Sequence, residues 1–156
     1  MNETNRIEYK AILTKELDLE KEVIAFLNYR EGGAIYIGID KLGNVVGVSD
    51  VDGDMLKVKD RIKMNISPSA MGLFAVSSEI IDDKSIIVIT VASGREKPYF
   101  KNKYGLNPKG TYIRIGTAAE PMPQDIIDNL FARRVRNSIG VIVSNRQYLT
   151  FEQLRI

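Results

Sequence analysis

The sequence predicts a single α+β domain, in which a mixed sheet of about five strands carries helices packed on one face. Two β-branched runs, residues 34–39 and 86–91, have the composition of strands. Leu19, Val23 and Phe26 recur at the spacing of one helix face. Strand-like and helix-like segments alternate along 156 residues, a length that suits one domain with its own core.

Local signals define the elements of the first third of the chain. Residues 8–13 are predicted as a short edge strand. Asp18 is placed to cap a helix that ends at Gly32-Gly33, since glycine suits a left-handed helix ending. The apolar run 34–39 is predicted as a strand buried on both faces, with residues 45–48 as its hairpin partner.

The same signals continue to about residue 135. A long polar connection, residues 93–110, precedes the last predicted strand, and connections of this length are often functional. The other predicted elements are a helix over 52–66, strands over 73–81, 85–91 and 111–115, and a helix over 123–135.

The end of the chain differs from the rest. We assign residues 1–136 to the domain and residues 137–156 to a linker and the start of a truncated C-terminal region. Thr150 and Gln153 form a capping-box pattern, which begins a helix that the sequence then cuts off. We therefore expect the chain to be the N-terminal module of a longer protein.

Composition excludes several kinds of chemistry. The chain has no Cys and no His, so it can form neither a Cys/His zinc site nor a Ser-His-Asp triad. A bound metal would be an oxygen-liking ion such as Mg²⁺ or Mn²⁺. No apolar run approaches the ~20 residues of a membrane helix, and the first residues lack a signal-peptide pattern, so a cytoplasmic location is expected.

Positive charge is concentrated in one part of a chain whose net charge is only +2. Residues 95–114 contain one acidic residue, Glu96, and six basic residues: Arg95, Lys97, Lys101, Lys103, Lys109 and Arg114. A basic strip on a nearly neutral protein favours a local contact with a polyanion. The alternative is a lysine-rich loop that is simply solvated.

Acidic residues near the N-terminus form a second candidate site. Glu8 and Lys10 would share one face of a strand, because side chains alternate along it. If residues 7–11 pair with residues 34–40, then Asp40 joins them, with Glu3 close by. Such carboxylates could bind a metal ion for phosphodiester cleavage. Alternatively, Glu8 pairs with Lys10 or Arg114, and Asp40 only supports a turn.

Five short motifs occur in order along the chain. The run Glu3–Lys10 (ETNRIEYK) is similar to the pattern E-S-x-x-L/V-E-F/Y-K, and residues 24–33 (IAFLNYREGG) to A-F-A-N-x-x-G-G. Residues 35–40 (IYIGID) with Gly43 and 46–48 (VGV) are similar to L-x-I-G-V-D…G…V-x-G, and Pro98-Tyr99 and 112–116 (YIRIG) to P-Y/F and Y-x-R-x-G. In these motifs the chain resembles the Schlafen AlbA-2 domain family, also called AlbA-like or divergent AAA-4. Thr4, Leu27 and Tyr29 depart from the family pattern.

This resemblance implies an AlbA-like fold and nucleic-acid binding, with DNA as the first expectation. It implies that the chain opens a bacterial transcriptional regulator with a downstream ATPase or winged-helix region. In animal Schlafen proteins, related domains cleave tRNA or rRNA with three acids, which correspond to Glu3, Glu8 and Asp40 here. Those enzymes use two domain copies, so a nuclease built on this chain would need a homodimer or another partner.

Three functional hypotheses follow. The first is a nucleic-acid-binding module whose phosphate contacts are Lys10, Arg95, Lys97, Lys101, Lys103, Lys109 and Arg114. The second is a Mg²⁺- or Mn²⁺-dependent endoribonuclease with Glu3, Glu8 and Asp40 as metal ligands and catalytic residues. In the enzyme, Lys10 would hold the scissile phosphate and Arg114 would stabilise the transition state. The third is a structural or dimerisation module.

Overall fold

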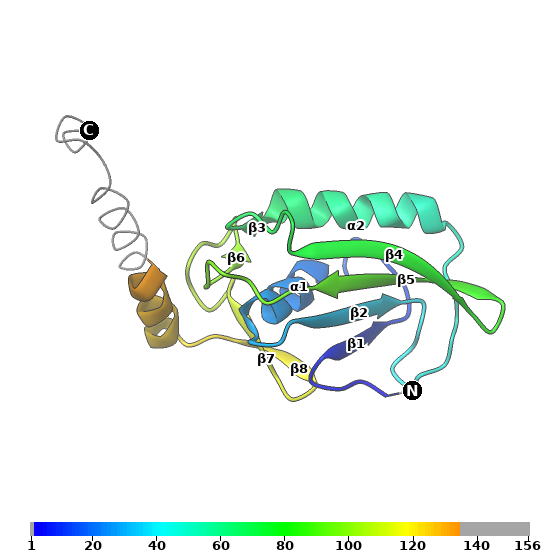
Figure 1. The fold of residues 1–156 in the computed structure, drawn as a ribbon, viewed down its shortest axis with the longest axis horizontal. Coiled ribbons are helices and arrows are strands. Elements are labelled where there is room, and N and C mark those ends of the chain that lie inside the picture. The colour runs from blue at the N-terminus through cyan, green and yellow to red at the C-terminus, as the bar shows by residue number, and fades with distance from the viewer. Residues whose placement is uncertain (1, 135–156) are drawn as a thin grey trace, which may run out of the picture.

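The computed structural model describes residues 2–134, which form a mixed four-stranded sheet with helices on one face (Figure 1). The strands lie in the order β1 (Ile7–Lys10), β2 (Gly33–Ile37), β5 (Lys84–Val91) and β4 (Phe74–Ile81). β1 and β2 are parallel, and the other pairs are antiparallel. The predicted α+β class is confirmed, with one strand fewer in the main sheet than expected.

Helices α1 (Leu19–Asn28) and α2 (Val51–Asn65) cover one face of the sheet. Each begins at an aspartate, Asp18 or Asp50, whose carboxylate accepts a backbone N–H of the first turn. The main core joins both helices to the sheet and contains, among others, Val23, Phe26, Leu27, Ile35, Ile37, Val58, Ile62, Ile87 and Ile89. Residues 124–134 form a further helix, with Ile127 buried.

The opposite face of the sheet carries a smaller apolar cluster. Tyr9, Ile39, Ile86 and Val88 are buried there, and Tyr36 packs against Tyr9 edge-on with ring centroids 5.9 Å apart. Along β2, however, alternate residues are only half-buried, because on this face Ala34 and Tyr36 pack only against the smaller cluster. The prediction that this strand is buried on both faces is therefore wrong.

Short two-stranded ribbons complete the fold. β3 (Ile66–Ser67) pairs with β6 (Phe100–Lys101), and β7 (Tyr112–Ile115) pairs with β8 (Ala118–Pro121). The long connection predicted without regular structure thus contains a strand. In contrast, residues 45–48 form no strand: Val45 makes a single bridge to Ile39, and Gly47 adopts a φ of +82°.

The polar connection from residue 93 to 110 is fastened to α1 by one buried amide. Asn28 Oδ1 accepts the Tyr99 N–H at 2.7 Å, and Asn28 Nδ2 donates to the carbonyls of Tyr99 (3.0 Å) and Tyr112 (2.8 Å). The N–H of Gly94 also donates to the Leu27 carbonyl at 2.8 Å. The connection is therefore positioned by the core.

Two expectations concern the end of the chain and the membrane. The predicted linker and helix start at 137–156 lie outside the described residues. Within residues 2–134, no helix is both long and apolar enough to span a membrane.

Candidate functional site

The parallel pairing of β1 with β2 brings the N-terminal acids to the end of the second strand. Glu8 lies opposite Ile35 and Lys10 opposite Ile37, so the condition under which these segments would meet is fulfilled. The Gly38 N–H donates to the Lys10 carbonyl at 2.8 Å and extends this contact. Because parallel strands end at the same edge, the residues just after β2 can reach back to the side chains of β1.

Glu8 is the centre of a cluster of ion pairs. Its Oε1 accepts a hydrogen bond from Lys41 Nζ at 2.9 Å and lies 3.6 Å from Lys10 Nζ. Its Oε2 accepts a hydrogen bond from Arg114 Nη1 at 2.9 Å. The same Lys41 ammonium donates to Glu3 Oε1 at 3.0 Å. The structure thus brings Glu3, Glu8 and Lys10 together, with Lys41 between the two acids.

Lys41 is the member of this cluster that was not predicted from the sequence. One signal in the sequence could have indicated it. Lys41 follows shortly after the segment that pairs in parallel with Glu8-Tyr9-Lys10. Burial acts to lower the pKa of Lys41, but the hydrogen bonds to Glu8 and Glu3 and the negative charges of these two acids together raise it. The ammonium therefore stays charged between the two carboxylates.

Asp40 faces its own loop. Its Oδ1 accepts the backbone N–H groups of Leu42 (3.0 Å) and Asn44 (2.9 Å), and its Oδ2 accepts Asn44 Nδ2 at 3.2 Å. The hydrogen bond from the Asn44 N–H is the largest of the effects that hold the Asp40 pKa below its usual value. This geometry is the turn-supporting role that the sequence offered as the structural alternative.

The arrangement does not suit a shared metal ion. Within residues 2–134 no three His, Cys, Asp or Glu side chains gather as a metal-binding group. The Lys41 ammonium bridges Glu3 and Glu8 at the position where a divalent ion would bridge them. Asp40 is engaged by its loop instead. A Mg²⁺ or Mn²⁺ ion would have to displace the lysine and turn Asp40 before all three acids could bind it.

Arg114 lies in the interior and not on the binding surface that the sequence suggested. Its side chain is fully buried, its Nη2 donates to the carbonyls of Thr4 (2.8 Å) and Ile7 (3.0 Å), and its guanidinium lies over the Phe26 ring at 4.9 Å. A phosphate cannot reach it in this conformation. Its role here is to hold the N-terminal segment against β7 and α1.

Glu22 is a second buried acid beside Arg114. Its Oε2 lies 3.7 Å from Arg114 Nη1 and has no hydrogen-bond partner among the described residues. Burial, and then the neighbouring Glu8 charge, raise the pKa of Glu22. For Glu8, burial also acts to raise the pKa, but hydrogen bonds from Lys41 and Arg114 outweigh it and the pKa is lowered. The two acids are thus shifted in opposite directions.

The predicted phosphate contacts divide into two groups. Arg95, Lys103 and Lys109 are exposed and Lys97 is half-buried, with its pKa lowered by burial. None of these four makes an ion pair within the part of the chain that is described. The other three are held in ion pairs: Lys10 with Glu8, Lys101 with Asp18 at 2.7 Å, and Arg114 with Glu8.

Solved structures share this fold. The N-terminal domain of a RecG-related protein from Nitrosomonas europaea is 26% identical, with a TM-score of 0.57, over 76% of this chain and 83% of that one. The DIP2311 protein from Corynebacterium diphtheriae is 19% identical, with a TM-score of 0.54. That match covers 76% of this chain but 22% of the Corynebacterium chain, and it shows the fold alone. A search of curated proteins finds no match.

A family comparison accounts for most of the chain. The profile described as Schlafen, AlbA_2 matches residues 3–123. The matched range contains the strands of the main sheet, the Glu8 cluster and the exposed cations of the connection. It also contains each of the five ordered motifs, from the ETNRIEYK run to YIRIG. The chain belongs to the Schlafen AlbA_2 family.

Proposed function

We propose that this domain binds nucleic acid, DNA in the first instance, through the exposed cations of the basic connection, defined as residues 93–110. The observation that carries the proposal is that Arg95, Lys103 and Lys109 are exposed and unpaired among the described residues. Exposed cations without acidic partners are available to replace the counterions of phosphates. Lys97 adds a half-buried cation to the same segment.

The way in which the connection is held supports this role. Asn28 fixes it to α1, and Arg134 Nη1 of the last helix donates to the Glu96 carbonyl at 2.8 Å. The connection and the described part of that helix lie at the same end of the molecule (Figure 1). Cations on a segment fixed by the core lose less entropy on binding than cations on a free loop.

The comparisons point in the same direction. The Nitrosomonas domain belongs to a protein named for its relation to the ATP-dependent DNA helicase RecG. The family assignment agrees with a nucleic-acid-related role. In this proposal the chain is the N-terminal module of a transcriptional regulator whose downstream ATPase or winged-helix region acts on the bound nucleic acid. A homodimer would double the number of phosphate contacts, and sedimentation velocity tests for it.

Binding is tested by fluorescence anisotropy with labelled duplex DNA, single-stranded DNA and RNA over a range of salt concentrations. We expect measurable affinity at low salt that falls linearly with the logarithm of salt concentration. If none of the probes binds at low salt, the proposed function is wrong. A stable dimer without any binding would favour the structural or dimerisation module instead.

The endoribonuclease hypothesis has one observation in its favour, the convergence of Glu3, Glu8 and Lys10. It requires a rearrangement in which Lys41 leaves the two glutamates and Asp40 leaves its loop. Binding requires no such change, since the exposed cations are already available. For this reason we propose binding as the function and treat cleavage as a separate hypothesis with its own test.

A further inference from the structure

A groove of about 840 Å³ opens beside the basic connection. One wall is the segment leading into α1, a second is α2 from Lys57 to Asn65, and a third is the turn from Lys101 to Tyr104. The groove was not predicted from the sequence, because its walls come from three segments far apart in the chain.

The floor of the groove is polar, but its polar groups are already paired. Arg61 donates to Glu20 through Nε (3.0 Å) and Nη2 (2.6 Å), and to the carbonyls of Thr14 (3.1 Å) and Leu17 (2.6 Å). Asn65 Nδ2 also donates to Glu20 Oε2, at 2.8 Å. This network stabilises the shape of the groove and leaves its rim to make new contacts.

An exposed aromatic ring stands at the mouth of the groove. Tyr104 is 43% exposed, yet its backbone is fixed, because the N–H groups of Tyr104 and Gly105 both donate to the Lys101 carbonyl at 3.1 Å. The Lys103 and Lys101 ammonium groups both lie over this ring, 4.9 and 5.7 Å from its centre. When the exposed Lys103 side chain moves from the ring to a phosphate, the tyrosine supplies a stacking surface and the lysine a phosphate contact, the two elements that bind a single strand.

The rim charges favour an anionic strand at only part of the groove. The acid Asp18 is neutralised by Lys101, and Glu20 by Arg61. Lys57 lies 3.9 Å from Asp54, so Lys15 and Lys103 remain against Glu16 and Asp60. Because the two acids repel phosphate, the backbone of a bound strand would follow Lys103 and Lys15, while a base lies on the tyrosine ring.

We infer that this groove binds single-stranded nucleic acid, with one base stacked on Tyr104 and phosphates beside Lys103 and its neighbours. The inference rests on the proposed function and names the form of nucleic acid that the site accepts. In a duplex the faces of the bases are covered by their neighbours, so the ring has no exposed base face to contact. Single-stranded DNA and single-stranded RNA offer the same stacking chemistry.

The test compares ring variants of the full 156-residue chain on single-stranded DNA, single-stranded RNA and duplex DNA of one sequence. Tyr104→Ala should weaken single-strand binding about tenfold, the size expected when one base stack is removed, and Tyr104→Phe should stay within about twofold. Duplex affinity should change less than about twofold in both variants. The matched control is Phe131→Ala, another exposed aromatic that does not line the groove.

The possible results separate this inference from the proposed function. Salt-dependent binding with equal single-strand affinity in Tyr104→Ala and Phe131→Ala would overturn the stacking site and leave the proposed function standing. Equal losses on duplex and single strand in Tyr104→Ala would also overturn it. Absence of binding to every probe would reject the proposed function, and the stacking site with it. A preference for the RNA strand over the DNA strand would support the site and add a contact to the 2′-hydroxyl.

Discussion

Arg114 Nη1 donates a hydrogen bond to Glu8 Oε2 at 2.9 Å, and both side chains are buried. The pair joins β7 to β1, two segments more than a hundred positions apart in the chain. Arg114 also holds the carbonyls of Thr4 and Ile7. One internal guanidinium therefore holds three groups of the N-terminal segment that carries the family's first motif.

Removing this guanidinium should destabilise the fold strongly. Arg114→Ala removes the donor to the buried Glu8 Oε2 and one donor from each of the Thr4 and Ile7 carbonyls, and we expect a loss of about 3–5 kcal/mol in the free energy of unfolding. Urea denaturation measures it. The control is Arg30→Ala, whose side chain is 82% exposed beside Glu31 and which should cost under about 1 kcal/mol. Similar losses in the two variants would contradict the interior role of Arg114.

Stability should depend on pH through Glu22. Its pKa is raised in the folded state, so its contribution is fully present below the unfolded value of 4.5 and is lost as pH rises through the folded pKa. Glu22→Gln cannot ionise and should be more stable than the parent chain at pH 7. That advantage should shrink as pH falls toward 4.5. Melting temperatures of both proteins between pH 4.5 and 7 measure this difference in stability. A difference that does not vary with pH would contradict a raised Glu22 pKa.

Glu8 should show the opposite pH dependence. Its pKa is lowered in the folded state, so its stabilisation is present above the unfolded value of 4.5 and is lost as pH falls through the folded pKa. Glu8→Gln should therefore be less stable than the parent chain at pH 7, and the deficit should narrow in acid. The same melting experiments measure it, and a deficit that grows in acid would show that the Glu8 pKa is not lowered.

Asn28 should control the position of the basic connection. Asn28→Ala removes hydrogen bonds to both backbone groups of Tyr99 and to the Tyr112 carbonyl, and we expect a cost of about 2–4 kcal/mol. Hydrogen exchange should speed up most around Tyr99, since the N–H of that residue loses its partner. Uniformly faster exchange throughout the chain would argue against a local anchoring role.

A cleavage assay decides the nuclease hypothesis. In the arrangement seen here, structured RNA should remain intact with Mn²⁺, because Lys41 lies between Glu3 and Glu8. The informative variants are Glu3→Gln and Asp40→Asn, which keep the side-chain shape and remove the charge. Mn²⁺-dependent cleavage by the parent chain that both variants abolish would establish the nuclease. Cleavage that persists in them would point to a contaminant.

The sequence predicts the elements that local signals define. The Asp18 cap and the periodic apolar residues place most helices and strands close to their observed bounds. The ribbon of β3 and β6 was not predicted, because two residues in each strand are too few for a periodic pattern. Residues 45–48 were predicted as a hairpin partner, but the left-handed Gly47 breaks the regular ladder, although the Val48 N–H still donates to the Ser85 carbonyl at 2.7 Å.

The site was harder to predict than the fold. Side-chain alternation along a strand predicted that Glu8 and Lys10 share a face, whereas the pairing of β1 with β2 entered only as a condition, which the structure meets. Whether a charged side chain points inward is not written in its sequence neighbourhood, so the sequence left Arg114 as either a phosphate contact or an ion-pair partner of Glu8, and the structure has the ion pair. Asp40 was left either beside Glu8 or supporting its own turn, and its hydrogen bonds are those of the turn. Local hydrogen bonds of this kind compete well with distant partners.

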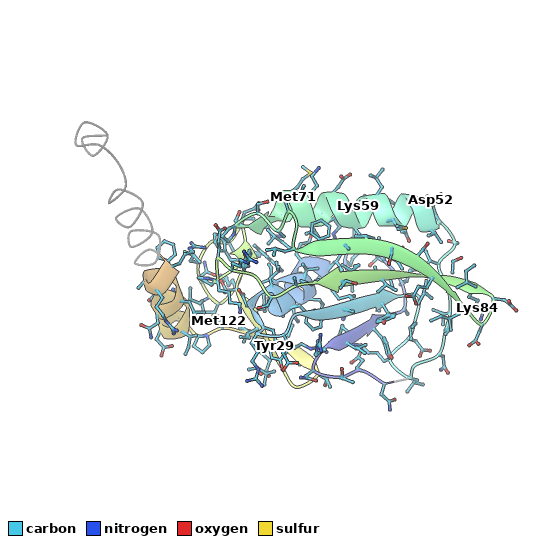
Figure 2. The ribbon with its side chains drawn as sticks, viewed as in Figure 1. Tyr29, Asp52, Lys59, Met71, Lys84 and Met122 are labelled. Atoms are coloured by element: carbon cyan, nitrogen blue, oxygen red, sulfur yellow. The ribbon has the colours of Figure 1, made fainter. Side chains whose placement is uncertain are left out.

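The central claim is that the exposed cations of the basic connection bind phosphates. The most direct test is the salt dependence of duplex DNA binding by the triple variant Arg95→Ala/Lys103→Ala/Lys109→Ala. The control is Lys84→Ala, at the β4–β5 turn. Lys84 lies at the opposite end of the molecule from Met122, the residue that follows β8 (Figure 2). We predict that the triple variant binds duplex DNA more weakly. Its slope of log K against log salt concentration should be shallower by up to about 0.9 for each phosphate that it no longer neutralises. Affinity and slope should change little in the control. An unchanged slope in the triple variant would contradict the claim.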